Sequence, residues 1–509
     1  MNTETCFLGI EFGSTRIKAA GLDAHYLPVQ AGGYSWKSSY TDGIWTYSMD
    51  EVMTGLKAAL EPFRGTAPKA VGISGMMHGY LAFDEDWNLL VPFRTWQNTI
   101  TGPASEELTG LFDFNIPQRW SIAHLYQAIL NKEEHIGKLA HITTLAGYVH
   151  HLLTGVNAVG VGEASGIFPI DSVNLCYDKK MVALFDERTA TKGFTKPLLE
   201  LLPAILPAGA AAGTLTEEGA ALLDGVLPVG TPFAPAEGDA GTGMTATNAV
   251  APRTGNISAG TSIFSMTVLE KRLKKVYSEI DMVTTPTGAP VAMVHCNNCT
   301  NDMNAWIGIL KETAALFGAE FSEGDLFTKL YLKSLEGDKD AGGVTVVNYM
   351  AGEGVSHFDE GRPMLLRKPD SNFTLANFMR AQLYSAMSTL HIGHKILQAE
   401  GVSTDEFVGH GGLFKTPGVA QNYMAAACLC PVTCMESAGE GGPYGMALLA
   451  AFACDGKGRT LEQFLNEEIF SSCKRVTVQP DPEIIEGFAA YADRFESALA
   501  AERAAVENC

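Results

Sequence analysis

A chain of 509 residues is longer than one hydrophobic core usually serves, so two domains of about 200–250 residues each are expected. Hydrophobic residues make up 46% of the chain and charged residues 18%, which is typical of globular proteins and excludes the disordered and fibrous classes. The net charge of −21 argues against an extended surface for nucleic acid or anionic membrane, although a nucleotide held by local amide groups remains compatible with it.

The sequence also bears on the location of the protein and on the state of its cysteines. Met1–Thr5 has no basic segment leading into an apolar one, which predicts no secretory signal. No apolar run reaches the ~18–20 residues of a membrane span, since Met446–Cys454 stops at Asp455, so a cytoplasmic protein is expected. Cys296 and Cys299 have CxxC spacing but no second pair at zinc-site spacing, and buried, reduced thiols are the favoured interpretation.

The chain opens with an apolar run, a polar glycine turn and a second apolar run, which predict a β-hairpin over residues 6–23. Amides from Gly13 to Thr15 could face a phosphate, and the hydroxyls of Ser14 and Thr15 would add donors. Glu11 could hold a hydrated Mg²⁺, an ion that prefers oxygen ligands. An ordinary hairpin is the alternative, because the chain has no Walker motif.

A second apolar run, Ala70–Gly75, leads into Met77 and His78. A histidine that follows a buried strand and precedes glycine can point into a cleft where a polyol hydroxyl binds. Further on, Trp96 and Asn98 offer an aromatic face and an amide, which suit a sugar. The alternative for His78 and Trp96 is ordinary core packing.

Residues 102–155 are predicted to be mainly helical, with helices at Tyr126–Glu134 and Leu145–Leu153. The pair His150-His151 falls in the second of these helices. We expect these histidines at a solvated helix end rather than as a ligand pair.

The stretch Ala236–Gly243 sets Asp239 among small residues near the middle of the chain. Its carboxylate is therefore left uncovered, with backbone close on both sides, which suits a general base that must meet a substrate hydroxyl. A simple turn is the alternative, since Gly-Asp pairs are common in turns. Pro252 and Gly255 follow and mark a boundary, which predicts domains at 1–252 and 253–509.

The segment Gly255–Met266 repeats the opening pattern, with Gly260 and Thr261 in the turn, and so predicts a second hairpin. Later, a strand runs into Gly411 and Gly412, where the backbone could approach a flat ligand or a phosphate closely. An acid between two phosphate-type loops is the layout of a phosphotransferase. Further helices are predicted at Asn301–Phe317, Asn372–Glu400 and Val419–Leu429.

Together these motifs resemble the FGGY family of carbohydrate kinases over nearly the whole chain. Within that family, Met76–Gly79 followed by Trp96-Gln97-Asn98 is most similar to the xylulokinase branch. Three segments depart from the family pattern: Glu11 stands where Asp is usual, Trp96–Ile100 lacks the usual acid and arginine, and the double glycine continues as the bulkier Leu413-Phe414-Lys415. The segments that resemble family motifs are Gly9–Thr15 and Gly260–Ser262 (phosphate hairpins), Gly238-Asp239 (catalytic acid), Gly411-Gly412 (adenosine loop) and Gly352-Glu353 (the family's Gly-Glu segment).

The resemblance implies an α/β fold of two ribonuclease-H-like (actin/hexokinase-like) domains that face each other across a catalytic cleft. It implies ATP-dependent phosphorylation of a ketose at a terminal hydroxyl, with xylulose as the favoured sugar. The implied roles are proton acceptor for Asp239, sugar contacts for Met77, His78, Trp96, Asn98 and Asp239, nucleotide contacts for Gly13, Ser14, Thr15, Gly260, Thr261, Gly411 and Gly412, and Mg²⁺ for Glu11.

Several alternatives stay open at the level of sequence. The substrate could be another ketose or polyol, such as ribulose, fuculose or glycerol. The chain could also be an actin-like ATPase without a sugar substrate, or a sugar-binding protein that has lost catalysis. The expected partners are a small sugar and ATP, with no nucleic acid and no membrane, and a homodimer is compatible with the family.

Overall fold

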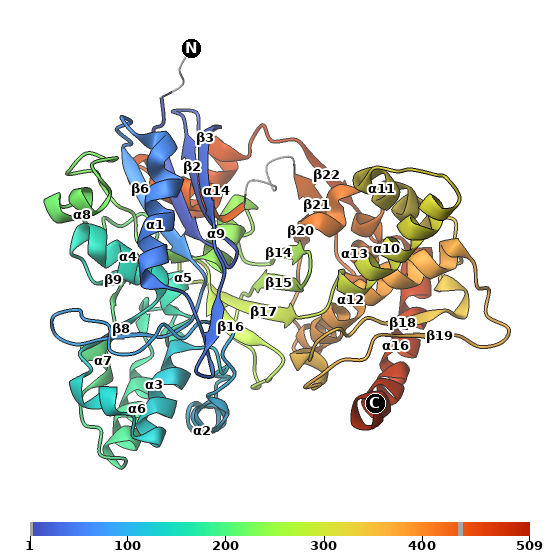
Figure 1. Ribbon diagram of the computed structural model, residues 1–509, viewed down its shortest axis with the longest axis horizontal. Helices are drawn as coiled ribbons and strands as arrows, with labels where there is room; N and C mark the ends of the chain where they lie inside the picture. Colours follow the sequence, from blue (N-terminus) through green and yellow to red (C-terminus); the bar gives the residue numbers. More distant parts are fainter. Residues whose placement is uncertain (1–3, 436–440) are drawn as a thin grey trace. The chain divides into compact units, whose positions relative to one another are not determined.

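The computed structural model describes residues 4–435 and 441–509, and these form an α/β structure of two compact units (Figure 1). The predicted α/β class is confirmed. The first unit comprises Met1–Pro252, Met282–Val291 and Glu440–Ser472. The second comprises Arg253–Asp281, Ala292–Gly439 and Cys473–Cys509. The first unit thus takes two further segments from the chain beyond Pro252.

The first unit is built on a five-stranded sheet in the order β13-β6-β1-β2-β3. Its strands are β1 (Phe7–Phe12), β2 (Arg16–Leu22), β3 (Pro28–Ser35), β6 (Ala70–Gly75) and β13 (Glu237–Gly238). β1 and β2 pair antiparallel, which confirms the predicted hairpin, whereas β6 pairs parallel with both β1 and β13.

The register of the parallel strands places three predicted site segments at one edge of this sheet. Phe12 lies opposite Gly75, and Gly75 lies opposite Gly238, so β1, β6 and β13 all end at the same level. The residues that follow these ends include Gly13, Met77 and Asp239. Because the carboxyl ends of parallel strands share an edge, segments far apart in sequence meet there.

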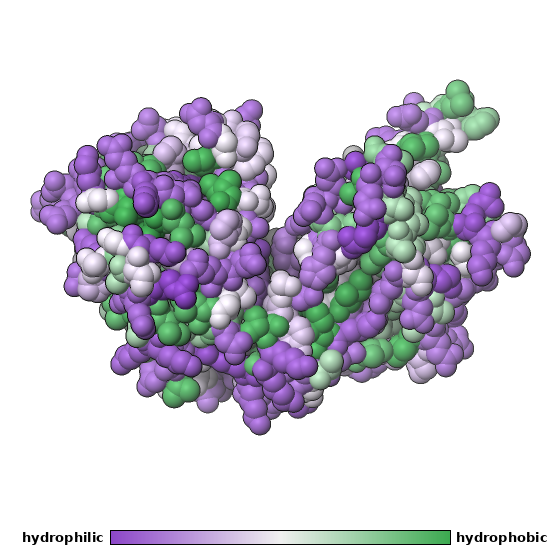
Figure 2. Space-filling view, turned by 90° about the horizontal axis from the view of Figure 1, so that it is seen from below, coloured by the Kyte–Doolittle hydropathy of each residue, from purple (hydrophilic) through white to green (hydrophobic). Residues whose placement is uncertain are grey.

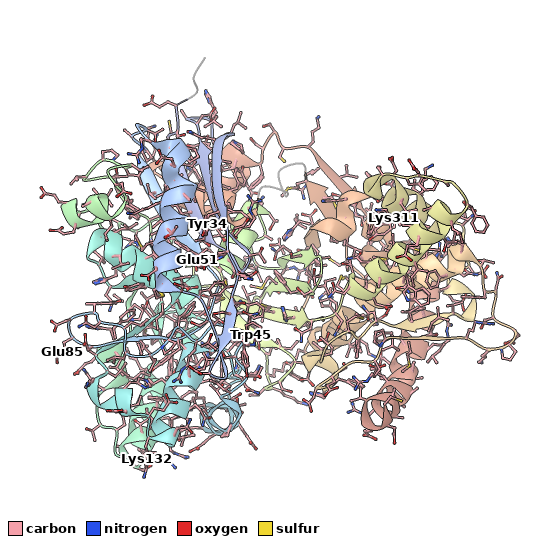
Figure 3. The ribbon with its side chains drawn as sticks, in the orientation of Figure 1. Tyr34, Trp45, Glu51, Glu85, Lys132 and Lys311 are labelled. Atoms are coloured by element: carbon pink, nitrogen blue, oxygen red, sulfur yellow. The ribbon has the colours of Figure 1, made fainter. Side chains whose placement is uncertain are left out.

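Helices cover the two faces of the sheet. On one face, α1 (Met49–Leu60) packs on β3, where Gly32 allows close approach to Ala59, and Tyr34 donates to Glu51 Oε1 at 3.4 Å (Figure 3). On the other face lies α14 (Gly441–Asp455), which packs against β1 and β6. Because side chains alternate along a strand, the α14 side of β1 carries Gly9 and Glu11.

The remaining elements of the first unit form small sheets and helices around this core. The helices are α2 (Gly102–Phe112), α3 (Ser121–Asn131), α4 (Leu145–Thr154), α5 (Val161–Ala164), α6 (Lys179–Ala190), α7 (Leu198–Leu201), α8 (Glu217–Leu222), α9 (Asp239–Ala246) and α15 (Leu461–Phe464). The short strand pairs are β4 (Ser39–Thr41) with β5 (Ile44–Thr46), β7 (Leu81–Phe83) with β8 (His141–Thr143), β9 (Ala158–Gly160) with β12 (Ala204–Leu206), and β10 (Ile170–Asp171) with β11 (Cys176–Tyr177).

The two adjacent histidines of α4 differ from their predicted environment. His150 is fully buried, and its Nε2 pairs with the Ala212 carbonyl at 2.8 Å, so the prediction of a solvated helix end was wrong for it. His150 lies on the helix face that also carries Leu153 and packs inward, with its ring edge against Phe233. His151 is half-buried and stacks on Trp87 with the ring centroids 3.6 Å apart. Burial lowers the pKa of both imidazoles.

A seven-stranded sheet has the order β16-β17-β15-β14-β20-β21-β22, and its strands β14, β15, β20, β21 and β22 belong to the second unit. Most of β16 and the start of β17 fall in the segment Met282–Val291. β14 and β15 pair antiparallel, which confirms the second predicted hairpin, and β20 pairs parallel with β14. The strands are β14 (Thr254–Ala259), β15 (Ile263–Val268), β16 (Asp281–Thr284), β17 (Pro290–Cys296), β20 (Glu406–His410), β21 (Val432–Met435) and β22 (Arg475–Val478), with a separate pair β18 (Thr345–Val347) and β19 (Met364–Leu366).

The helices of the second unit are α10 (Asn301–Leu316), α11 (Glu323–Ser334), α12 (Leu375–Ala399), α13 (Ala420–Cys428) and α16 (Pro482–Asn508). Three of these confirm helices predicted from apolar periodicity, with ends shifted by a few residues. Within the described residues, no helix combines the length and the apolar character that crossing a bilayer requires. Figure 2 shows a mainly hydrophilic face with smaller hydrophobic groups among the polar side chains, as expected from a net charge of −21.

Candidate active site

Asp239 is the first residue of α9, directly after the short strand β13. Its Oδ1 accepts a hydrogen bond from the Met77 amide at 3.2 Å, and the residue itself is exposed to solvent. The structure therefore brings together the predicted acid and the predicted sugar-contacting turn, which are 162 residues apart in the chain. An accessible carboxylate held by a backbone N–H is a suitable proton acceptor.

The environment of Asp239 raises its pKa to about 6. The main cause is desolvation of the carboxyl group by the protein atoms packed around it. This effect acts even though part of the residue is exposed to solvent. The Met77 amide acts in the opposite direction and lowers the pKa, while the negative charge of Glu11 raises it again. A carboxylate of this pKa is ionised at neutral pH and more basic than an ordinary aspartate.

Glu11 lies on the α14 side of β1, opposite Lys18 in the hairpin register. Its Oε2 forms an ion pair with Lys18 Nζ at 3.1 Å. A Cβ placed on Gly442 of α14 would lie 2.7 Å from the Glu11 Cδ, and 3.4 Å from Thr242 Oγ1. Glycine at position 442 is thus required for the helix to approach this carboxylate, which stands next to the start of α9.

A metal at this site would have few protein ligands. Among the described residues, no group of three or more His, Cys, Asp or Glu side chains is arranged to hold a metal ion. Mg²⁺ bound with nucleotides usually keeps several waters and takes one or two carboxylates, so a single glutamate fits that pattern. Glu11 is only 8% exposed, and one of its oxygens is shared with Lys18.

The first hairpin turn is held by two aromatic side chains that sequence reasoning missed. The Gly13 carbonyl accepts from Trp36 Nε1 at 2.7 Å, and the Ser14 carbonyl accepts from Tyr47 Oη at 2.7 Å. The two rings stack with their centroids 4.2 Å apart, and the Trp36 amide donates to the Thr15 carbonyl at 3.1 Å. With all three carbonyls tied to the protein, the exposed Ser14 and Thr15 present donors to solvent. This suits an anion.

His78 has a backbone conformation that is uncommon for a residue with a side chain. Its φ is 73°, and that of the following Gly79 is 93°. The ring is buried, stacks on Trp120 with the centroids 5.9 Å apart, and places Nδ1 3.2 Å from the Gly166 carbonyl. A left-handed conformation at a bulky residue costs energy and is concentrated at functional sites. Trp120 carries no signal in the sequence that would have singled it out.

The second hairpin turn repeats the construction of the first within the second unit. The Gly260 carbonyl accepts from the Thr300 amide at 3.2 Å and from its hydroxyl at 2.8 Å. The Thr261 carbonyl accepts from the Cys299 amide at 3.1 Å, and Thr261 itself is exposed. Both carbonyls are bonded within the protein, and the Gly260 amide donates to the Ser262 carbonyl at 2.9 Å. The exposed Thr261 is therefore the residue of this turn that can offer donors to an anion.

The double glycine lies beside this second turn. Gly411 has a φ of 100°, and a Cβ there would lie 3.0 Å from the carbonyl carbon of Ala259, the residue before Gly260. Only glycine allows the chain to cross the end of β14 this closely. Nothing lies within 4 Å of a Cβ placed on Gly412, so space is open at that position. The structure therefore brings the predicted adenosine loop and the second predicted phosphate hairpin together.

Comparison with known proteins identifies the family. The model of the FGGY carbohydrate kinase N-terminal domain matches residues 7–245, and the model of the C-terminal domain matches residues 255–454. The chain belongs to the FGGY family of carbohydrate kinases. The predicted family is thereby confirmed. The chain is also 23% identical to the xylulose kinase of Haemophilus influenzae over 489 residues, which cover 89% of this chain and 91% of that protein.

Solved structures of sugar kinases share the fold of this FGGY kinase. A structure titled as a xyloylose kinase from Brucella ovis has a TM-score of 0.80 at 18% identity, covering 97% of this chain and 99% of its own. A gluconate kinase from Lactobacillus acidophilus has a TM-score of 0.79 at 15% identity and covers 97% of each chain. These likenesses confirm the predicted fold class.

In this FGGY kinase the Asn98 side chain forms hydrogen bonds with protein backbone groups. Asn98 is 2% exposed; its Oδ1 accepts from the Trp45 amide at 2.8 Å, and its Nδ2 donates to the Trp45 carbonyl at 2.8 Å and the Thr95 carbonyl at 2.9 Å. Trp45, on β5, is labelled in Figure 3. The amide thus fixes the turn that carries Trp96, a side chain 37% exposed. Sugar contacts by Asn98 and Trp96 stay predictions.

Replacing Asn98 by alanine is expected to lower the free energy of unfolding by about 2–3 kcal/mol, because three backbone groups lose a buried partner. Urea unfolding followed by circular dichroism measures this. Alanine at the exposed Asn131 is the matched control and should change stability by less than ~0.5 kcal/mol. Equal losses in both variants would show that Asn98 does not anchor its turn.

The CxxC segment of the FGGY kinase is organised around Asn298 rather than around its thiols. Asn298 Oδ1 accepts from the Met350 amide at 2.9 Å and from the Ala351 amide at 3.0 Å. Its backbone and side-chain N–H groups donate to Glu353 Oε2 at 3.2 and 3.1 Å. The predicted Gly352-Glu353 segment is therefore joined to the chain just before Cys299, which holds the Thr261 turn. Cys296 and Cys299 are buried, and burial raises the pKa of both thiols.

Proposed function

We propose that this FGGY kinase transfers the γ-phosphoryl group of ATP to a terminal hydroxyl of a ketose, with xylulose as the substrate. The contact between the Met77 amide and Asp239 carries this proposal, because it places a proton acceptor beside the turn expected to hold the sugar. The xylulose kinase of Haemophilus influenzae, similar over most of its length, supports the choice of sugar.

In the proposed reaction, the sugar hydroxyl oxygen forms a bond to the γ-phosphorus as the bond from that phosphorus to the β–γ bridging oxygen breaks. The hydroxyl proton passes to the carboxylate of Asp239, and ADP leaves with the bridging oxygen. The Met77 amide keeps the carboxylate in one orientation. Phosphoryl transfer depends mainly on such positioning and on charge stabilisation.

The two hairpin turns are proposed to hold the phosphates of ATP, the donor that kinases of this family use. In the first unit the proposed donors are the amides and hydroxyls of Ser14 and Thr15, since the Gly13 amide donates to the Arg16 carbonyl at 3.0 Å. In the second unit they come from Thr261, since the Gly260 amide donates to the Ser262 carbonyl at 2.9 Å. Gly13 and Gly260 are proposed to let the backbone approach the phosphates closely. Gly411 and Gly412 would lie against the adenosine.

Glu11 is the residue that would hold a hydrated Mg²⁺, which would neutralise phosphate charge during transfer. Lys18, the ion-pair partner of Glu11, adds a positive charge at the same hairpin. With ATP and a small sugar as its partners, the enzyme is expected in the cytoplasm, without nucleic acid or membrane, and a homodimer stays a prediction.

The sugar is proposed to lie between His78 and the exposed face of Trp96. His78 is fixed by the Gly166 carbonyl and by stacking on Trp120, so its ring would meet the sugar in one orientation. An indole face such as that of Trp96 packs well against the C–H side of a sugar.

A sugar panel tests the proposal. ATP turnover with Mg²⁺ is measured with xylulose, ribulose, fuculose, glycerol and gluconate, and kcat/KM is expected to be highest for xylulose. Gluconate is included because a gluconate kinase shares the fold. A higher kcat/KM for another sugar would mean that the protein is a kinase for that sugar and not for xylulose. ATP hydrolysis at the same rate with and without sugars would favour an ATPase.

A further inference from the structure

A second acid, which the proposed mechanism does not use, lies directly behind the Gly-Asp motif. Glu237 is two residues before Asp239 and belongs to β13, where it pairs with Ser74 of β6. In contrast to Asp239, it is only 2% exposed. A glutamate buried to this degree normally needs dedicated hydrogen-bond donors.

Three glycines enclose the Glu237 side chain. A Cβ on Gly160 would lie 3.1 Å from the Glu237 Cδ, and one on Gly162 would lie 2.9 Å from it. A Cβ on Gly241 would lie 3.1 Å from the Glu237 Cγ. The side chain therefore fills a slot between the segment that runs from β9 into α5 and the first turn of α9. No larger residue at the three glycine positions would leave room for it.

Backbone amides from both sides of this slot converge on the Glu237 carboxylate. The Gly238 amide donates to Oε1 at 3.1 Å. The amides of Gly162 and Glu163, at the start of α5, also bond to the carboxylate and favour its charged form. One carboxylate thus joins α5 to the residue that immediately precedes Asp239. Both oxygens must accept for this arrangement to hold.

Glu163 is the other carboxyl group packed into this region. It is fully buried, and a Cβ on Gly238 would lie 2.6 Å from its Oε2. Among the described residues, no donor lies in good hydrogen-bond geometry with either of its oxygens. The charge of Glu237 raises the pKa of Glu163, so the two buried carboxyl groups resist being ionised together. The amide donors favour the charged form of Glu237, whereas burial without such donors favours the neutral form of Glu163.

The direction of the pKa shifts agrees with this assignment. Burial raises the pKa of Glu237 to about 7, against the lowering effect of its amide donors. Burial raises the pKa of Glu163 well above its ordinary value, the hydroxyl of Thr144 lowers it, and the charges of Glu237 and Asp239 raise it. The acid facing these two from α9 is Asp239, whose own pKa is raised in turn by Glu11.

We propose that Glu237 is a positioning residue for phosphoryl transfer: its carboxylate ties the Gly238-Asp239 peptide to α5 and so fixes the proton acceptor against the Met77 amide. Glu237 touches neither the sugar nor the nucleotide in this proposal, which rests on the proposed role of Asp239. A displacement of about 1 Å at a reacting group can cost ~10²-fold in rate. The effect is therefore expected in kcat rather than in substrate binding.

A pair of isosteric variants tests this assignment. Glu237→Gln replaces one accepting oxygen by a donor that faces backbone N–H groups, and kcat is expected to fall ~30–100-fold, with KM for ATP and for xylulose within about threefold of wild type. Glu163→Gln keeps the shape and neutrality of a protonated glutamic acid, so its kcat should stay within about threefold of wild type. Both are measured at temperatures where circular dichroism shows the variant folded.

Glu237→Asp is the second variant, in case Glu237→Gln does not fold. It keeps the charge but withdraws the oxygens by one methylene, and an intermediate kcat with unchanged KM values is expected. A wild-type kcat in either Glu237 variant, or a larger loss in Glu163→Gln than in Glu237→Gln, would overturn the proposal. Asp239→Asn is measured alongside: if it retains turnover, the proposed function fails, whereas if only the Glu237 variants retain turnover, only the positioning role fails.

Discussion

Asp239→Asn is expected to lower kcat ~10³-fold, because a positioned general base typically contributes 10²–10⁴-fold. Asparagine has the same size and keeps an oxygen that can accept from the Met77 amide, but it cannot take up the hydroxyl proton. KM for ATP should stay within about threefold of wild type, since the nucleotide donors belong to other segments. Coupled ADP release, measured with saturating xylulose, gives both constants.

The pH dependence of the same reaction separates loss of a base from loss of structure. Asp239, with its pKa raised to about 6, must be ionised to accept a proton. Glu237, whose pKa is raised to about 7, must also be ionised in its proposed positioning role, so the wild-type kcat/KM should become level only above pH ~8. Below pH 6 the loss of the Asp239 charge should lower kcat/KM towards a further tenfold for each pH unit. Asp239→Asn should lack this limb. Asp50→Asn, at an exposed position of α1, is the matched control and should keep the wild-type profile.

Gly9→Ala is expected to give the largest loss of stability, about 2–4 kcal/mol in the free energy of unfolding. Gly9 lies in the middle of β1, and α14 crosses directly over it. An alanine Cβ would lie 2.5 Å from the Ala447 amide nitrogen and closer still to the Pro443 carbonyl oxygen. Both neighbours are helix backbone, so the whole helix would have to shift. Urea unfolding followed by circular dichroism measures the change.

Gly110→Ala is the control for that experiment. Gly110 lies in α2, is exposed, and has nothing within 4 Å of an added Cβ. Alanine there should stabilise the protein by roughly 0.5–1 kcal/mol, because glycine is a poor helix former. If Gly9→Ala were as stable as wild type, the close packing of α14 on β1 would not hold in solution.

Local patterns predicted the parts of the site that depend on local structure. Apolar run, polar glycine turn and apolar run are enough to specify a hairpin, and both hairpins occur where that pattern placed them. The small residues around Asp239 likewise predicted an accessible acid. Its contact with the Met77 amide depends on two parallel strand ends reaching one level, which no single motif contains.

Contacts between distant segments account for what the sequence did not reveal. Trp36 and Tyr47 hold the first turn through backbone carbonyls, and neither residue lies in a recognisable motif. Glu237 lies in the stretch Ala236–Gly243, but its slot is formed by glycines some 75 residues earlier in the chain as well as by one in α9. Asn98 was predicted to contact a sugar because an amide suits one, and nothing in the sequence indicates that this amide bonds to the backbone of Trp45. Such pairings follow only from the fold.

Simultaneous assay of ADP and phosphorylated sugar tests the proposed function most directly. The purified protein is incubated with ATP, Mg²⁺ and xylulose, and both products are quantified by mass spectrometry and enzymatic ADP detection. One xylulose phosphate, carrying the new group on its terminal hydroxyl, should form for each ADP, and omission of the sugar should stop ADP formation. ADP that accumulates equally without sugar, or with no phosphorylated sugar beside it, would contradict a ketose kinase.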